Sequence, residues 1–100
     1  MEIEEIDVDQ MLEMVREGAQ LIDVRESEEL GTDGSIDGMV HMPLSEFESY
    51  EEEVAKDRPV IIYCRSGRRS LRAAEIAAEW TSEPVYSLRG GILAYKKAYE

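Results

Sequence analysis

The sequence has 100 residues, with 23 acidic and 11 basic side chains and a net charge of −12 at pH 7. This length predicts that residues 1–100 form a single domain, and the acidic balance argues against nucleic acid as a general partner. There is no apolar run of about 18 residues to span a membrane. The acidic start, Met1 to Glu5, lacks the apolar stretch that a signal peptide would show, and there is one cysteine. These features together predict a cytoplasmic protein.

The first quarter of the chain predicts a strand, a helix and a second strand. Residues 3–6 suit a short edge strand, and Asp7 or Asp9 can cap the helix that follows. Gly18 is expected to end that helix. Residues 21–24 form an apolar run typical of a buried strand.

The middle of the chain predicts less regular structure. Residues 25–30 leave the strand through about one helical turn, and the glycines of residues 31–43 indicate a loop. A short strand is expected within residues 39–42. An acidic helix then begins at Ser45, with Glu48 as its capping-box partner.

The second half predicts two units of a strand followed by a helix. Residues 60–63 are the most strand-like stretch, and residues 71–80 form a helix with a face of small side chains. The last strand covers residues 84–88, and the closing helix covers residues 92–99. This alternation predicts an α/β fold: a three-layer sandwich whose mostly parallel sheet of about five strands has helices on both faces.

The only cysteine, Cys64, follows the most strand-like stretch and precedes a helix. Ligands of open α/β sheets bind beyond the carboxyl ends of strands, where loop N–H groups and the helix dipole stabilise an anion. Such surroundings lower the pKa of a cysteine from about 8.5 to below 7, and Gly67 lets the loop curl inward. Four arginines follow the cysteine within eight residues: Arg65, Arg68, Arg69 and Arg72. The pattern indicates a reactive thiolate.

The charge distribution favours the same place. Residues 1–57 carry 19 acidic and 3 basic side chains, whereas residues 58–100 carry 4 acidic and 8 basic ones. Between Arg58 and Arg72 there are five arginines and no acid. An acidic protein with one basic segment predicts a site for a small anion.

Two kinds of cysteine chemistry are compatible with this loop. Cysteine phosphatases need five residues between the cysteine and an arginine that clamps phosphate, but Ser70 stands in that register. Only four residues separate Cys64 from Arg69. A loop one residue shorter makes a smaller cradle, which suits one extra sulfur on Cys64 better than a phosphate.

The chain resembles single-domain rhodaneses, the thiosulfate sulfurtransferase type of domain. Residues 64–70 match the family's Cys-x-x-Gly-x-Arg-Ser loop, and residues 22–25 match its Asp-Val-Arg motif. The family's Gly–Ile–Gly stretch and the Pro-Leu that follows it match residues 34–38 and 43–44. Its closing Gly-Gly turn matches residues 88–91, and all the matches run in the family's order.

The resemblance implies a two-step transfer without a cofactor or a metal. The thiolate of Cys64 attacks the outer sulfur of thiosulfate or a similar small anionic donor, and sulfite leaves. The N–H groups of residues 65–69 hold the resulting persulfide. A thiophilic acceptor, either cyanide or a cellular thiol, then removes the sulfur.

Seven residues are expected to bind the substrate: Arg25, Arg65, Ser66, Gly67, Arg68, Arg69 and Ser70. Arg65 and Arg69 are the expected contacts of the donor anion. Arg68 either joins them or points to solvent and steers anions. Ser70 either caps the helix or bonds to the loop.

Other residues of the motifs have less specific expectations. Asp23 is expected to brace the loops, while Arg25 either reaches the pocket or is structural. His41, the only histidine, is assigned a surface or packing role. The family usually has histidine where Ser35 stands, so the sequence leaves the conformation of residues 31–38 open.

Three other functions share these residues in whole or part. Cys64 could act as a persulfide carrier for a thiol-bearing partner protein, because one cysteine provides no internal resolving thiol. The chain could instead be a regulatory interaction module, which the intact cysteine loop disfavours, or a cysteine phosphatase or arsenate reductase, which the loop length disfavours. A monomer without nucleic-acid or membrane partners is expected.

Overall fold

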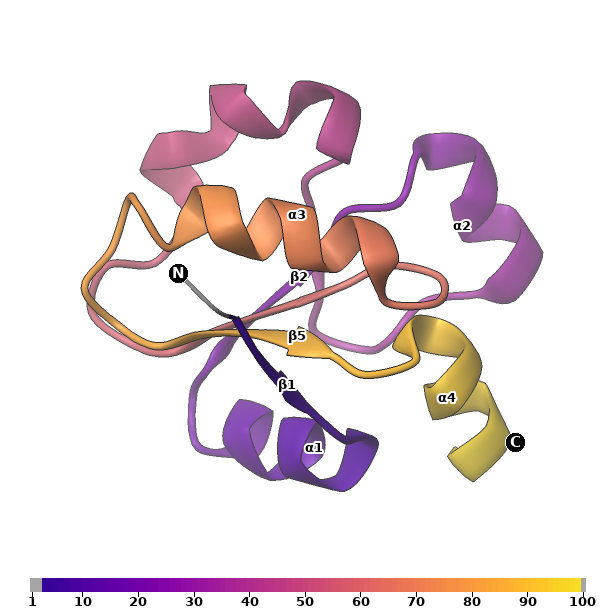
Figure 1. Cartoon of the computed structure of the whole chain (residues 1–100). Helices are drawn as coiled ribbons and strands as arrows, with labels where there is room; N and C mark the ends of the chain where they lie inside the picture. The colour runs from indigo at the N-terminus through magenta and orange to yellow at the C-terminus, as the bar shows by residue number, and fades with distance from the viewer. Residues whose placement is uncertain (1–2, 100) are drawn as a thin grey trace.

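The computed structural model describes residues 3–99, so Met1 and Glu2 of the acidic start lie outside it. The elements in chain order are β1 (Glu4–Ile6), α1 (Val8–Arg16), β2 (Gln20–Asp23), α2 (Ser27–Asp33), β3 (Val40–His41), the 3-10 helix η1 (Leu44–Glu53), β4 (Val60–Tyr63), α3 (Arg68–Ala77), β5 (Val85–Leu88) and α4 (Gly91–Tyr99). Figure 1 shows the sheet running through the middle, with helices above and below it.

The five strands form one sheet in the order β1-β5-β4-β2-β3, and every neighbouring pair is parallel. β4 lies at the centre because all four of its residues are buried and each is apolar or aromatic. The predicted fold class, a parallel α/β sheet of about five strands covered on both faces, is confirmed.

Each face of the sheet has its own core. α3 and η1 cover one face, and α1 and α4 cover the other (Figure 1). Along β4, Val60 and Ile62 belong to the core under α3, whereas Ile61 and Tyr63 belong to the core over α1 and α4. Because side chains alternate along a strand, Cys64 continues the first series and faces α3.

The structure corrects the predicted boundaries in the middle of the chain. α2 extends through Gly31 to Asp33, so the predicted loop begins only at Gly34. A capping box between Glu26 and Glu29 starts this helix. An interior glycine costs a helix about 1 kcal/mol relative to alanine, which explains why the sequence pattern placed the boundary earlier.

The predicted capping box of η1 is wrong, and α3 starts earlier than predicted. η1 begins at Leu44, and the hydroxyl of Ser45 donates instead to Glu26 at 2.7 Å. α3 begins at Arg68 rather than at residue 71. Arg68 and Arg69 therefore lie in the first turn of α3, whereas Arg65 lies in the loop before it.

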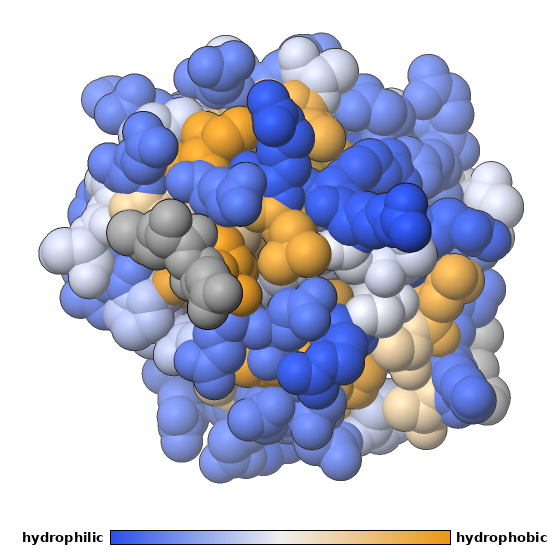
Figure 2. All heavy atoms as spheres, in the orientation of Figure 1, coloured by the Kyte–Doolittle hydropathy of each residue, from blue (hydrophilic) through white to orange (hydrophobic). Residues whose placement is uncertain are grey.

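The surface is predominantly hydrophilic on the face that Figure 2 shows, with apolar side chains visible in patches between charged ones. Within residues 3–99, no helix is both long and apolar enough to cross a bilayer.

Candidate active site

Cys64 lies where the central strand β4 ends and α3 begins. The residue is 1% exposed, and its neighbour Gly67 is the N-cap of α3 with φ +111°. A Cβ added at Gly67 would lie 3.3 Å from the backbone nitrogen of Gly90, so a side chain would crowd the turn after β5. Glycine at this position allows both the left-handed conformation and the close approach.

The sulfur takes the place of the side-chain cap that Gly67 lacks. The N–H of Gly67 donates to Sγ at 3.1 Å, and the N–H of Ser70 donates at 3.4 Å. These N–H groups belong to the first turn of α3, where no carbonyl within the helix can accept them. A negative charge on Sγ is therefore favoured by both hydrogen bonds and the helix dipole.

The pKa of Cys64 follows from these opposed effects. Burial raises the pKa of the thiol, but hydrogen bonds from the Ser70 hydroxyl and from the N–H groups of Ser70, Gly67 and Ser66 outweigh it. The net pKa lies below its ordinary value. These hydrogen bonds therefore favour the thiolate over the neutral thiol.

The first turn of α4 supports the loop from behind. The N–H of Ile92 donates to the carbonyl of Cys64 at 2.9 Å, and the N–H of Leu93 donates to that of Arg65 at 3.2 Å. Gly91 has φ +58°, and a Cβ there would collide with both carbonyls, at 2.5 Å from that of Arg65. Glycine at position 91 therefore allows α4 to approach and hold the cysteine loop.

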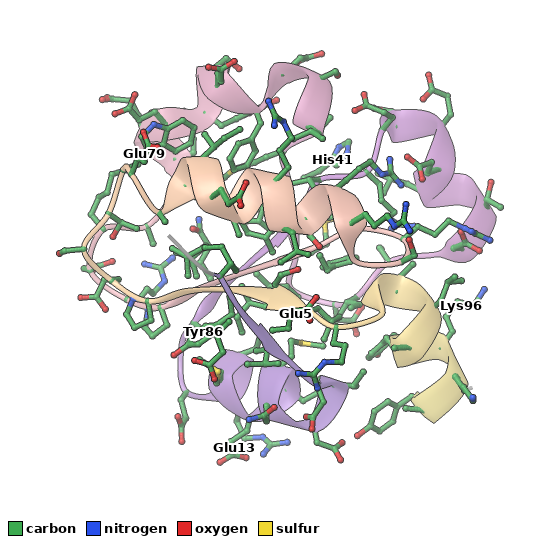
Figure 3. The ribbon with its side chains drawn as sticks, viewed as in Figure 1. Glu5, Glu13, His41, Glu79, Tyr86 and Lys96 are labelled. Carbon is green, nitrogen blue, oxygen red and sulfur yellow. The ribbon has the colours of Figure 1, made fainter. Side chains whose placement is uncertain are left out.

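The two arginines expected to bind the donor anion are paired with carboxylates of α2. Arg69 donates to both oxygens of Glu29, at 2.6 and 2.7 Å. Arg65 pairs with Asp33 at 3.2 Å, and Lys96 approaches the same carboxylate at 3.8 Å. Figure 3 shows Lys96 projecting from α4. The basic segment at the cysteine is therefore partly neutralised by α2.

These ion pairs change the pKa values of their members. The hydrogen bond from Arg69 is the main reason that the pKa of Glu29 falls to about 2, against the opposing effect of burial. The same bond raises the pKa of Arg69, and the nearby charge of Cys64 contributes to that rise. Arg69 thus keeps its charge next to the sulfur.

The remaining loop residues are distributed between the pocket and solvent. Ser70 is fully buried, with Oγ 3.5 Å from the sulfur, so it contacts Cys64 directly. Arg68 and Ser66 are exposed, as is Arg72 on the next turn of α3. Arg58 precedes β4 and lies at the opposite end of that strand from Cys64.

Arg25 does not lie where a substrate from solvent would meet it. Its side chain is 0% exposed, and its guanidinium donates to the equally buried carboxylate of Asp23 at 2.7 Å and to the carbonyl of Gly34 at 2.6 Å. Burial lowers the pKa of Arg25, but the hydrogen bond and charge of Asp23 raise it overall. The placement disagrees with the expectation of a substrate contact and makes Arg25 a brace for the loop after α2.

The segment around Ser35 is held from below by Tyr63. The N–H of Ile36 donates to the Tyr63 hydroxyl at 3.1 Å, and the Arg25 guanidinium lies 5.7 Å from the centre of the Tyr63 ring.

His41, labelled in Figure 3, places Nε2 2.6 Å from the carbonyl of Arg25. Within residues 3–99, no group of three or more histidine, cysteine or acidic side chains could hold a metal ion.

Sequence reasoning missed three residues of the site. Glu29 and Asp33 lay in a segment expected to be a turn and a loop, so nothing placed them opposite the arginines. Ser87 was missed although it gave a signal, because it is a polar residue inside a buried central strand. Its hydroxyl lies 2.7 Å from that of Ser70.

Comparison with known proteins assigns the family. The profile of the Rhodanese-like domain matches residues 7–98. The chain belongs to the rhodanese-like family. The resemblance found in the motifs is thereby confirmed for nearly the whole sequence.

Individual relatives agree with the assignment. This rhodanese-like chain is 41% identical over 73 residues to the uncharacterized protein YqhL of Bacillus subtilis, covering 73% of this chain and 57% of YqhL. It is 34% identical to the putative sulfurtransferase YtwF of the same organism, covering 96% of this chain and 93% of YtwF. It is 29% identical to the thiosulfate sulfurtransferase GlpE of Shewanella oneidensis, covering 93% and 92%.

Solved structures have the same fold. The reduced CoADR-RHD protein of Bacillus anthracis superimposes with a TM-score of 0.85 at 33% identity, over 93% of this chain and 16% of that one. A rhodanese-related protein from Thermoplasma volcanium gives a TM-score of 0.85 at 25% identity, over 96% and 93%. The rhodanese-like domain thus occurs both within a much longer chain and in a chain of similar length.

Proposed function

We propose that the protein is a sulfurtransferase that carries a sulfane sulfur on Cys64. The observation that carries the proposal is the position of the cysteine sulfur, which accepts hydrogen bonds from the N–H groups of Gly67 and Ser70 at the start of α3. This arrangement favours negative charge on sulfur, which the nucleophile and its persulfide both need. Named sulfurtransferases among the relatives support the same reaction class.

The reaction with thiosulfate balances without a further reactant. The Cys64 thiolate forms a bond to the outer sulfur, the sulfur–sulfur bond of thiosulfate breaks, and sulfite leaves with the electron pair. An acceptor such as cyanide then attacks the terminal sulfur of the persulfide. Thiocyanate leaves, and the thiolate is restored.

Burial of the cysteine favours donors with a protruding terminal sulfur. At 1% exposure, Cys64 presents very little area to solvent. A terminal sulfur on thiosulfate or on a persulfide is small enough to approach such a site, whereas a bulky ester is not. We propose a reducing, cytoplasmic setting for this chemistry, because it keeps the single thiol free.

A second candidate, a persulfide carrier, is favoured by the ion pairs of α2. Arg65 and Arg69 are each bonded to a carboxylate, so a dianionic donor must compete with Asp33 and Glu29. A small-molecule or protein persulfide, which passes its terminal sulfur to Cys64 and leaves as a thiolate, carries less charge than thiosulfate and needs fewer free arginines. Comparing the rates of Cys64 persulfide formation from thiosulfate and from a small-molecule persulfide separates the two functions.

The decisive experiment is intact mass spectrometry of the whole protein. Incubation with thiosulfate is expected to add roughly 32 Da, and cyanide is expected to remove it as thiocyanate. Cys64→Ser is expected to abolish the adduct without unfolding the protein. If neither thiosulfate nor a small-molecule persulfide gives an adduct, or if a phosphate ester is hydrolysed instead, sulfur transfer is overturned.

A further inference from the structure

Ser87 places a hydroxyl group inside an otherwise apolar part of the sheet. It lies in β5 opposite Ile62 of β4, and its side chain is 0% exposed. Val85, two residues earlier on the same strand, belongs to the apolar core under α3. A buried hydroxyl must find a hydrogen-bond partner, so its presence here calls for a specific contact.

That contact is the hydroxyl of Ser70, 2.7 Å away. The Ser70 hydroxyl also lies 3.5 Å from the sulfur of Cys64 and 3.2 Å from the carbonyl of Gly67. It has one proton and three neighbours that can accept it. The partner that receives the proton decides whether the sulfur gains a hydrogen bond.

Counting protons settles the direction of the bond between the serines. Within residues 3–99, Ser70 is the one hydrogen-bond partner found for the Ser87 hydroxyl. If Ser70 donated to Ser87, the Ser87 proton would be buried without an acceptor. The satisfied arrangement therefore has Ser87 donating to Ser70, which leaves the Ser70 proton for the sulfur or for Gly67. A charged sulfur accepts it more strongly than a neutral carbonyl does.

We propose that Ser87 is a positioning residue, which donates its hydroxyl proton to Ser70 and so directs the Ser70 proton to the sulfur of Cys64. Ser87 does not touch the reacting atoms and acts only through Ser70. The proposal rests on the proposed function in one respect, namely that Cys64 is the reactive group. It extends the site from the loop into the neighbouring strand.

The experiment measures the ionisation of the chain's only cysteine. The rate of alkylation by iodoacetamide, measured against pH, gives the midpoint of the ionisation of Cys64 directly, because the chain has no other thiol to react. Ser87→Ala removes the hydroxyl with little change in volume. It is expected to raise the midpoint by about 0.5 to 1 pH unit, a threefold to tenfold loss of thiolate below the midpoint.

A double mutant tests whether the effect passes through Ser70. Ser70→Ala is expected to raise the midpoint further than Ser87→Ala does, and Ser87→Ala in that background is expected to add nothing. Ser87→Thr keeps a hydroxyl and is expected to retain the wild-type midpoint. The packing control is Val85→Ala, which is expected to lower the melting temperature without moving the midpoint.

An unchanged midpoint in Ser87→Ala overturns the proposal, as does an equal shift in the presence and absence of the Ser70 hydroxyl. Alkylation needs no sulfur donor, so this result is independent of the persulfide assay. Failure to form a persulfide, together with the expected coupling, would reject the proposed function and leave the role of Ser87 standing.

Discussion

The two terminal nitrogens of Arg69 donate hydrogen bonds to the two carboxylate oxygens of Glu29, at 2.6 and 2.7 Å, and so join α3 to α2 beside the cysteine. The side chains are 35% and 27% exposed, so solvent reaches the pair only partly. A bidentate pair fixes the orientation of the guanidinium as well as its charge. Arg69, which we expect to bind the donor anion, is thus held by a competing carboxylate.

Replacing Glu29 is expected to favour anionic donors. Glu29→Gln keeps one hydrogen-bond acceptor for Arg69 but removes the negative charge, so a thiosulfate dianion meets an uncompensated guanidinium. A pair of this exposure is worth about 1 kcal/mol, so the KM for thiosulfate is expected to fall about fivefold with little change in kcat. Steady-state thiocyanate production at fixed ionic strength measures both constants.

Glu28→Gln is the matched control for charge. Glu28 lies on the same helix and is exposed, so its loss changes the net charge equally without releasing Arg69. Equal effects of the two substitutions would show that only the overall charge matters. A higher KM in Glu29→Gln would mean that the pair positions Arg69 for the donor.

The same pair is expected to make stability depend on pH in acid. Because the folded-state pKa of Glu29 is lowered to about 2 from 4.5, the pair stabilises the fold fully above pH 4.5. That contribution is lost as the pH falls from 4.5 towards 2. After allowance for solvent screening, Glu29→Gln is expected to cost about 1 kcal/mol at pH 7 and close to nothing at pH 2. Urea unfolding at several pH values measures the difference, and a constant difference would contradict it.

Arg25 is expected to matter for stability and not for donor binding. Arg25→Lys cannot reproduce the buried bidentate contact with Asp23, and breaking such a pair costs about 3 kcal/mol. Arg65→Ala removes a half-exposed side chain and is expected to raise the KM for thiosulfate while changing stability by less than about 0.5 kcal/mol. A stable Arg25→Lys protein with a raised KM would restore Arg25 as a substrate contact.

Gly91→Ala is expected to damage the active site from outside it. The added methyl group would collide with the carbonyls of Cys64 and Arg65, so the loop must move, at a cost of about 3 kcal/mol and most of the activity. Gly18→Ala is the control, because Gly18 also has positive φ but open space around it. It is expected to lose about 1 kcal/mol and to keep full activity. Similar activities of the two variants would show that the loop tolerates displacement.

Much of the fold could be predicted because its strands are short, apolar and separated by helices. Residues 60–63 were predicted with the bounds that β4 has, since full burial on both faces leaves an unbroken apolar run. The extent of α2 could not be predicted, because Gly31 contradicts a helix locally. The helix is held there by contacts of Glu29 and Asp33 with residues more than thirty positions away.

The candidate cysteine and its loop could be proposed from the sequence, but their surroundings could not. Cys64 and the loop are contiguous, so order and spacing were enough to propose their chemistry. The partners of Arg65 and Arg69 come from α2, and the partner of Ser70 comes from β5. Spacing within one motif carries no information about such contacts, which depend on how the sheet brings distant segments together.

The hydrogen bonds from Ile92 and Leu93 to the carbonyls of Cys64 and Arg65 also set an order of events during synthesis. A nascent chain that has released the cysteine from the ribosome but not yet residues 91–93 lacks the support behind the loop. The strand beside β4 that carries Ser87 is likewise made more than twenty residues later. The contacts that favour a charged sulfur are therefore complete only after β5 has joined the sheet and α4 has packed behind the loop.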